Sequence, residues 1–144
     1  MSTRGAYGFY KSGIKKIAFN RWDSYPSGLG QDIISYIVSK SIQELNKDFE
    51  SINLVIDTDS LSPEAYDSLE QARGSLTKYA KIGLMLDESE FLKDHLFCEW
   101  AYIINLDTNT LEVYQSGDSS LIRELAINED LQNNWKKFVS EIEG

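Results

Sequence analysis

Cysteine, histidine and proline are scarce in this sequence, with one Cys, one His and two Pro among 144 residues. A single cysteine cannot form an internal disulfide, which excludes a disulfide-stapled scaffold. Cys98 and His95 together cannot supply the Cys/His ligand set of a usual structural zinc site. The apolar runs fall far short of the ~20 residues that a membrane span needs. The opening residues carry no basic segment leading into an apolar one, so we expect a cytoplasmic protein without a membrane partner.

Positive charge is also scarce, but it gathers near the start of the chain. The sequence has 14 Lys+Arg against 23 Asp+Glu, for a net charge of −9. Its first 25 residues nevertheless hold five basic residues against Asp23 alone, interleaved with six aromatic residues. Such a mixture can hold an anion beside a flat ring. The acidic remainder disfavours duplex nucleic acid, because like charges repel at long range.

The hydrophobic content is enough for a folded core, which places the chain outside the disordered class. Hydrophobic residues make up 42% and aromatic residues 12% of the sequence. No linker or internal repeat divides residues 1–144, and this length suits a single domain.

Two β-hairpins are predicted from runs of β-branched and aromatic residues. The first joins residues 7–10 and 14–19 through the turn Lys11-Ser12-Gly13, and the second joins residues 100–106 and 110–115 through Asp107-Thr108-Asn109. An alternative for Lys11, Lys15 and Lys16 is that they only solvate the first turn. Residues 53–57 are either a strand or an extended connection.

Helical periodicity is clearest from Gln31 to Phe49, where one long amphipathic helix is predicted. Ser62-Pro63-Glu64 predicts the start of a second helix that stops near Gly74. Residues 76–86 are ambiguous in period, residues 87–96 are expected to be helical, and Asn128 is expected to cap a terminal helix. The predicted class is α+β, an antiparallel sheet from two β-hairpins packed against amphipathic helices.

The loop between the first hairpin and the long helix is the main candidate site. Glycines let backbone N–H groups approach a ligand, and a helix start carries partial positive charge. Gly28-Leu29-Gly30 lacks the Lys-Ser/Thr of a phosphate loop and the third glycine of a dinucleotide fingerprint. These glycines could instead only shape the entry to the helix. The predicted ligand-binding residues are Arg4, Arg21, Trp22, Asp23, Tyr25, Gly28 and Gly30.

Two segments near the start resemble a known group of sequences. The segments TRGAYGF (residues 3–9) and NRWDSYPSGLG (residues 20–30) resemble an uncharacterised microbial and fungal family with TRGxYGF and NxxDSYPxGLG segments. The resemblance covers about the first fifth of the chain and implies no activity. Ser2 also stands where N-terminal nucleophile hydrolases, which the chain resembles faintly, carry their nucleophile.

Three functions follow as hypotheses. The first is a binding module that recognises a small anionic or nucleotide-like ligand, or a partner protein, through the first hairpin and residues 23–30. The second is an amide or ester hydrolase in which Ser2 attacks and its own α-amine is the base. The third is an acidic protein-interaction domain. No metal or cofactor is predicted, and we expect His95 to be exposed or weakly paired and Cys98 to be a buried apolar residue.

Overall fold

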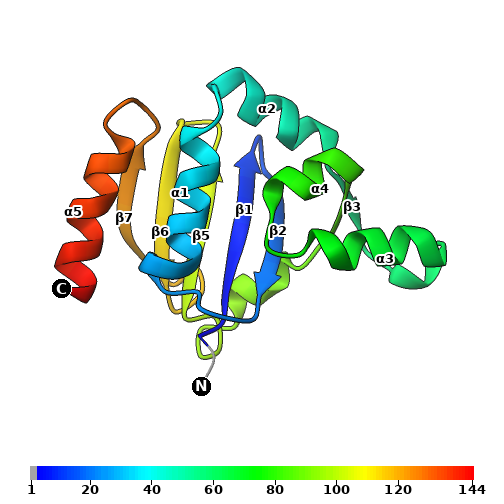
Figure 1. Cartoon of the computed structure of the whole chain (residues 1–144). Coiled ribbons are helices and arrows are strands. Elements are labelled where there is room, and N and C mark those ends of the chain that lie inside the picture. Colours follow the sequence, from blue (N-terminus) through cyan, green and yellow to red (C-terminus); the bar gives the residue numbers. More distant parts are fainter. Residues whose placement is uncertain (1–2) are drawn as a thin grey trace.

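A five-stranded sheet organises the computed structural model, which describes residues 3–144 (Figure 1). The strand order is β2-β1-β5-β6-β7, and neighbouring strands are antiparallel except for β1 and β5, which run parallel. The two predicted hairpins are therefore confirmed, and they meet at the centre of one sheet. The strands are β1 (Gly5–Lys11), β2 (Ile14–Asn20), β5 (Trp100–Asn105), β6 (Thr110–Gln115) and β7 (Ser120–Ala126).

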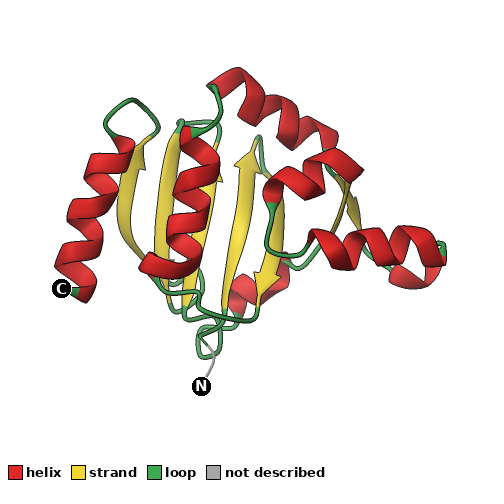
Figure 2. Cartoon of the chain, in the orientation of Figure 1, coloured by secondary structure: helices red, strands yellow, loops and turns green. Residues whose placement is uncertain are grey.

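One face of the sheet is covered by helices and holds the main core (Figure 2). Because side chains alternate along a strand, Tyr7 and Phe9 point toward these helices, while Ala6 faces the opposite side. On that opposite side the 3₁₀ helix Ser89–Lys93 packs Leu92 against the sheet. The helices are α1 (Gln31–Val38), α2 (Ile42–Ser51), α4 (Leu76–Ile82) and α5 (Leu131–Glu143).

A smaller unit lies beside the β2 edge of the sheet. It spans residues 53–86 and contains α3 (Pro63–Ala72), α4 and a two-stranded parallel sheet of β3 (Asn53–Val55) and β4 (Leu84–Leu86). We call it the β3–β4 unit. Glu88, just after it, binds β2 twice, because its amide donates to the Ile17 carbonyl at 3.1 Å and its carboxylate accepts from the Phe19 amide at 3.1 Å.

The α+β class is confirmed, as is the helix that Ser62 begins, whose hydroxyl accepts a hydrogen bond from the Ala65 amide. The single long helix over residues 31–49 is wrong, because the chain ends α1 at Val38 and begins α2 at Ile42. Ser41 and Glu44 form a reciprocal capping box there, which satisfies the free amides of a new helix start.

The helix expected over residues 87–96 is also wrong, since only the short 3₁₀ helix forms. The Asp87 carboxylate accepts hydrogen bonds from the amide and hydroxyl of Ser89, and the Asp94 carboxylate accepts one from the Phe97 amide. Both acidic side chains therefore stabilise turns instead of a continuous helix. Asn128 does not cap α5 directly; it accepts from the amide of Asp130, the residue that precedes the helix.

Lys16 does more than solvate the first turn. It is only 9% exposed, and its Nζ donates hydrogen bonds of 2.6 Å to the carbonyls of Phe49 and Ile52 at the end of α2. The ammonium also lies 4.1 Å from the centre of the Phe49 ring. Lys16 therefore joins β2 to α2 by satisfying carbonyls that a helix end leaves free.

In the described part of the chain, no helix is long and apolar enough to cross a membrane.

Candidate functional site

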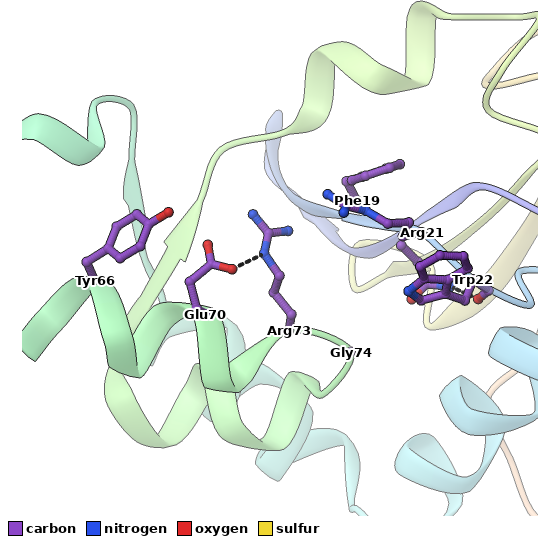
Figure 3. A pocket seen from close by; sticks show the side chains of 8 residues that line it. Phe19, Arg21, Trp22, Tyr66, Glu70, Arg73 and Gly74 are labelled. Atoms are coloured by element: carbon purple, nitrogen blue, oxygen red, sulfur yellow. Dashed lines mark hydrogen bonds and ion pairs between the residues drawn. The ribbon is translucent and has the colours of Figure 1, made fainter. Parts of the chain in front are cut away.

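A cleft of about 500 Å³ opens between the end of β2 and helix α3. Figure 3 shows the two walls: Phe19, Arg21 and Trp22 on one side, and on the other Tyr66 and Glu70 of α3 with Arg73, which follows that helix. Its volume lies within the range of about 300–1,000 Å³ that is usual for small-molecule sites. The eight described lining residues are Phe19, Asn20, Arg21, Trp22, Tyr66, Glu70, Arg73 and Gly74.

The first wall is held by the bend that follows β2. Asn20 donates hydrogen bonds through Nδ2 to the Trp22 carbonyl at 2.5 Å and to Ser24 Oγ at 2.8 Å. Ser24 is fully buried, and its carbonyl accepts a hydrogen bond of 2.7 Å from the Tyr102 hydroxyl. The bend is thus fixed at both ends, while Trp22 between them is 64% exposed.

The second wall comes from one face of α3. Tyr66 and Glu70 occupy positions i and i+4, which share one side of a helix, whereas Leu69 and Ala72 are buried on the other; Arg73 follows directly at the end of α3. Tyr66 is 43% exposed. The first wall therefore presents two aromatic rings and one arginine, and the second presents one aromatic ring and one arginine.

Arg73 is oriented by two carboxylates. Its Nε lies 3.2 Å from Glu70 Oε2, and its Nη1 lies 3.3 Å from Glu88 Oε1. Burial lowers the pKa of Arg73, but the carboxylates of Glu88 and Glu70 together raise it by more than burial lowers it. The net pKa of Arg73 therefore lies above its ordinary value. The guanidinium therefore stays charged, and it is held in place before any ligand arrives.

Arg21 stands opposite Arg73. Its guanidinium carbon lies 6.0 Å from the centre of the Phe19 ring, and no described carboxylate lies within ion-pair distance of it. In Figure 3 the Arg21 side chain extends toward the wall that carries Arg73. An anion placed between the two guanidinium groups can accept charge-assisted hydrogen bonds from both.

The base of the cleft is connected to the core. The Gly74 amide donates a hydrogen bond of 2.6 Å to the hydroxyl of Tyr7, a fully buried residue of β1. Burial raises the pKa of Tyr7 well above its ordinary value, so the hydroxyl stays protonated. This contact fixes the end of α3, and therefore the second wall, against the main sheet.

The structure brings together only two of the seven predicted ligand residues, Arg21 and Trp22, in the cleft. Arg4 lies elsewhere, with its guanidinium carbon 5.5 Å from the centre of the Phe97 ring and its amide 3.3 Å from Glu99. Asp23 adopts a positive φ of 51°, and its carbonyl accepts a hydrogen bond of 2.8 Å from Leu29. Asp23 and Tyr25 are exposed but are not in the lining, and the nearby Asp23 charge raises the pKa of the Tyr25 phenol.

Gly28 and Gly30 have a packing reason to be glycine. A Cβ atom at Gly28 would collide with the Asp23 carbonyl oxygen, and one at Gly30 would come within 2.5 Å of Trp135 Cζ2. The wide helical turn Pro26–Gly30 therefore fits against α5, where the Glu143 carboxylate accepts hydrogen bonds from the amide and hydroxyl of Ser27. The alternative in which these glycines shape the helix entry has direct structural support.

The other candidates for chemistry do not join this cleft. Ser2 lies outside the described residues. Cys98 is fully buried, as predicted, and burial raises the pKa of its thiol to about 12. His95 is exposed and pairs with Asp118 at 3.0 Å, which matches the expected weak pairing.

Sequence reasoning missed the wall that α3 supplies. Tyr66, Glu70 and Arg73 lie more than 40 residues from Arg21 in the chain, so no local motif joins the two walls. Their i, i+4, i+7 spacing was visible within a predicted helix, but it looks like an ordinary solvent-exposed face. Only the tertiary position of the β3–β4 unit gives that face a partner.

Comparisons with known proteins identify no family for this chain. No family model, no curated protein and no solved structure matches the chain. The resemblance of the opening segments stays a prediction, and the geometry of the cleft carries the functional argument.

Proposed function

We propose that the protein is a binding module whose cleft between β2 and α3 holds a small anionic ligand. The observation that carries the proposal is the pair of arginines on opposite walls, Arg21 without a described acidic partner and Arg73 oriented by two acids. A phosphate or carboxylate placed between them would accept charge-assisted hydrogen bonds from both guanidinium groups.

The site lies on a protein of net charge −9, which limits what can approach it. Long polyanions meet repulsion from the acidic surface, whereas a small anion needs only the local field of the cleft. The lining contains two arginines and one glutamate, and Glu88 beside Arg73 adds a second carboxylate, so the formal charges balance and the anion would be held mainly by Arg21, which has no described acidic partner. The site therefore suits a compact ligand with one strongly anionic group.

The test uses ribose 5-phosphate and inorganic phosphate as probes. A ligand that binds only the folded state stabilises it, so the melting temperature should rise with probe concentration at constant ionic strength. Isothermal titration calorimetry gives the affinity directly. Arg21→Gln should weaken binding of both probes at least about 10-fold, because it removes a charge-assisted hydrogen bond of typically ~1.5–3 kcal/mol.

Arg4→Gln is the matched control, because it removes another exposed arginine of the same N-terminal region that lies beside Phe97 rather than in the cleft. It should bind both probes like the unaltered chain. Phosphate also stabilises proteins generally by exclusion from their surface, and the two variants share that effect. Equal responses from Arg21→Gln and Arg4→Gln, or no measurable binding by the unaltered chain, would overturn the proposal.

A further inference from the structure

The cleft holds more than a pair of cations. Trp22 is 64% exposed and Tyr66 is 43% exposed, although large aromatic rings usually bury most of their surface. Neither ring has an aromatic or cationic stacking partner among the described residues. Both rings belong to the cleft that also presents Arg21 and Arg73.

An exposed tryptophan held on a fixed bend offers a ready stacking surface. The hydrogen bonds from Asn20 to the Trp22 carbonyl and to Ser24 order the backbone on both sides of the ring. A planar heterocycle can stack on such a ring without requiring the loop to become ordered first, which lowers the entropic cost of binding. A simple inorganic anion would leave this surface unused.

We infer that the ligand of the cleft is a nucleoside monophosphate, whose phosphate lies between Arg21 and Arg73 and whose base stacks on Trp22. This inference rests on the proposed function and names the class of ligand for the same site. The base is planar and the phosphate carries up to two negative charges, so the two parts match the ring and the arginines respectively.

The charge balance argues for one phosphate rather than several. Arg73 already pairs with Glu70 and Glu88, at 3.2 and 3.3 Å, so two carboxylates more than offset its single charge, and Arg21 is the cation of the lining without a described acidic partner. Each additional phosphate would add negative charge, and the lining has no further unpaired cation to balance it. The acidic body of the protein would oppose that charge further.

The experiment compares 5′-AMP and 5′-GMP with ribose 5-phosphate and adenosine by isothermal titration calorimetry. At least one of the nucleotides should bind 10-fold or more tightly than ribose 5-phosphate, since base stacking on an aromatic side chain contributes about that much or more. Adenosine should bind weakly, because it lacks the phosphate. Trp22 fluorescence should change on nucleotide binding.

Trp22→Leu removes the stacking surface and should reduce the affinity for the preferred nucleotide to near that of ribose 5-phosphate. Phe97→Leu is the matched control, because Phe97 is a half-exposed aromatic residue that contacts Arg4 outside the cleft. It should retain the preference for the nucleotide. Circular dichroism and melting curves establish that both variants fold.

The two proposals fail in different ways. If ribose 5-phosphate binds as tightly as both nucleotides, or if Trp22→Leu keeps the preference, the nucleotide inference is wrong while the anion site stands. 5′-ADP is titrated under the same conditions, and if it binds more tightly than 5′-AMP, the assignment of a monophosphate is wrong. If none of the phosphates binds, the proposed function is wrong, and the inference falls with it.

Discussion

Individual residues in the loop after β2 divide into those that face the cleft and those that support it. Arg21 and Trp22 expose their side chains to the cleft, whereas Ser24, Leu29 and Gly30 are buried. The sequence alone does not distinguish the two groups, because turn-forming and aromatic residues are mixed throughout this loop. Solvent exposure separates the two groups, and it depends on contacts with β5 and α5 that local sequence does not reveal.

Gly30→Ala tests the supporting role. Gly30 has ordinary helical backbone angles, so alanine brings no backbone strain, but its Cβ would press against Trp135. We expect a loss of about 1–3 kcal/mol in the free energy of unfolding, typical of overpacking, measured by urea denaturation. The neighbouring Gln31→Ala should stay within about 0.5 kcal/mol of the unaltered chain. Normal stability of Gly30→Ala with lost ribose 5-phosphate binding would instead make Gly30 a ligand contact.

At the scale of elements, the hairpins and the helix that begins after Ser62 could be predicted because each has its own local signal. The division between α1 and α2 was missed, although Ser41 and Glu44 show the spacing of a capping box. Continuous apolar periodicity across residues 31–49 outweighed that signal. Strand β7 has no strong alternation, and it is defined by its pairing with β6 rather than by its own residues.

Ser41→Ala measures what the helix start contributes. The Ser41 hydroxyl accepts a hydrogen bond of 3.1 Å from the Glu44 amide, and alanine leaves that amide unpaired within the helix. We expect the free energy of unfolding to fall by about 1 kcal/mol, measured by urea denaturation. Ser35→Ala, on the exposed side of α1, should change it little. A loss of the same size in both variants would contradict a specific role for the cap.

On the scale of the whole molecule, the fold class follows from the order of elements, but the cleft does not. It forms because the β3–β4 unit lies beside β2, and this placement depends on side-chain contacts such as that of Glu88 with Phe19 and that of Tyr7 with Gly74. Segments widely separated in the chain meet there. Composition could indicate that an anion site was plausible near the start, but it could not identify the second wall.

Salt should affect stability and binding in opposite directions. The protein carries a net charge of −9, so screening of repulsion should raise the melting temperature between about 20 and 200 mM sodium chloride. The same screening should weaken ribose 5-phosphate binding at Arg21 and Arg73. Calorimetric titration and thermal melts over one salt series measure both. Binding that strengthens with salt would contradict an electrostatic site.

The parallel pairing of β1 with β5 also has a consequence during synthesis. Gly5 pairs with Trp100, so the middle of the sheet joins residues 95 positions apart. Such distant pairings slow folding, because the chain must close a long loop before the contact stabilises it. The first hairpin emerges from the ribosome early, yet one of its edges stays unpaired until β5 has been translated. An open strand edge invites pairing with other chains, so the growing polypeptide is most vulnerable to aggregation during that interval.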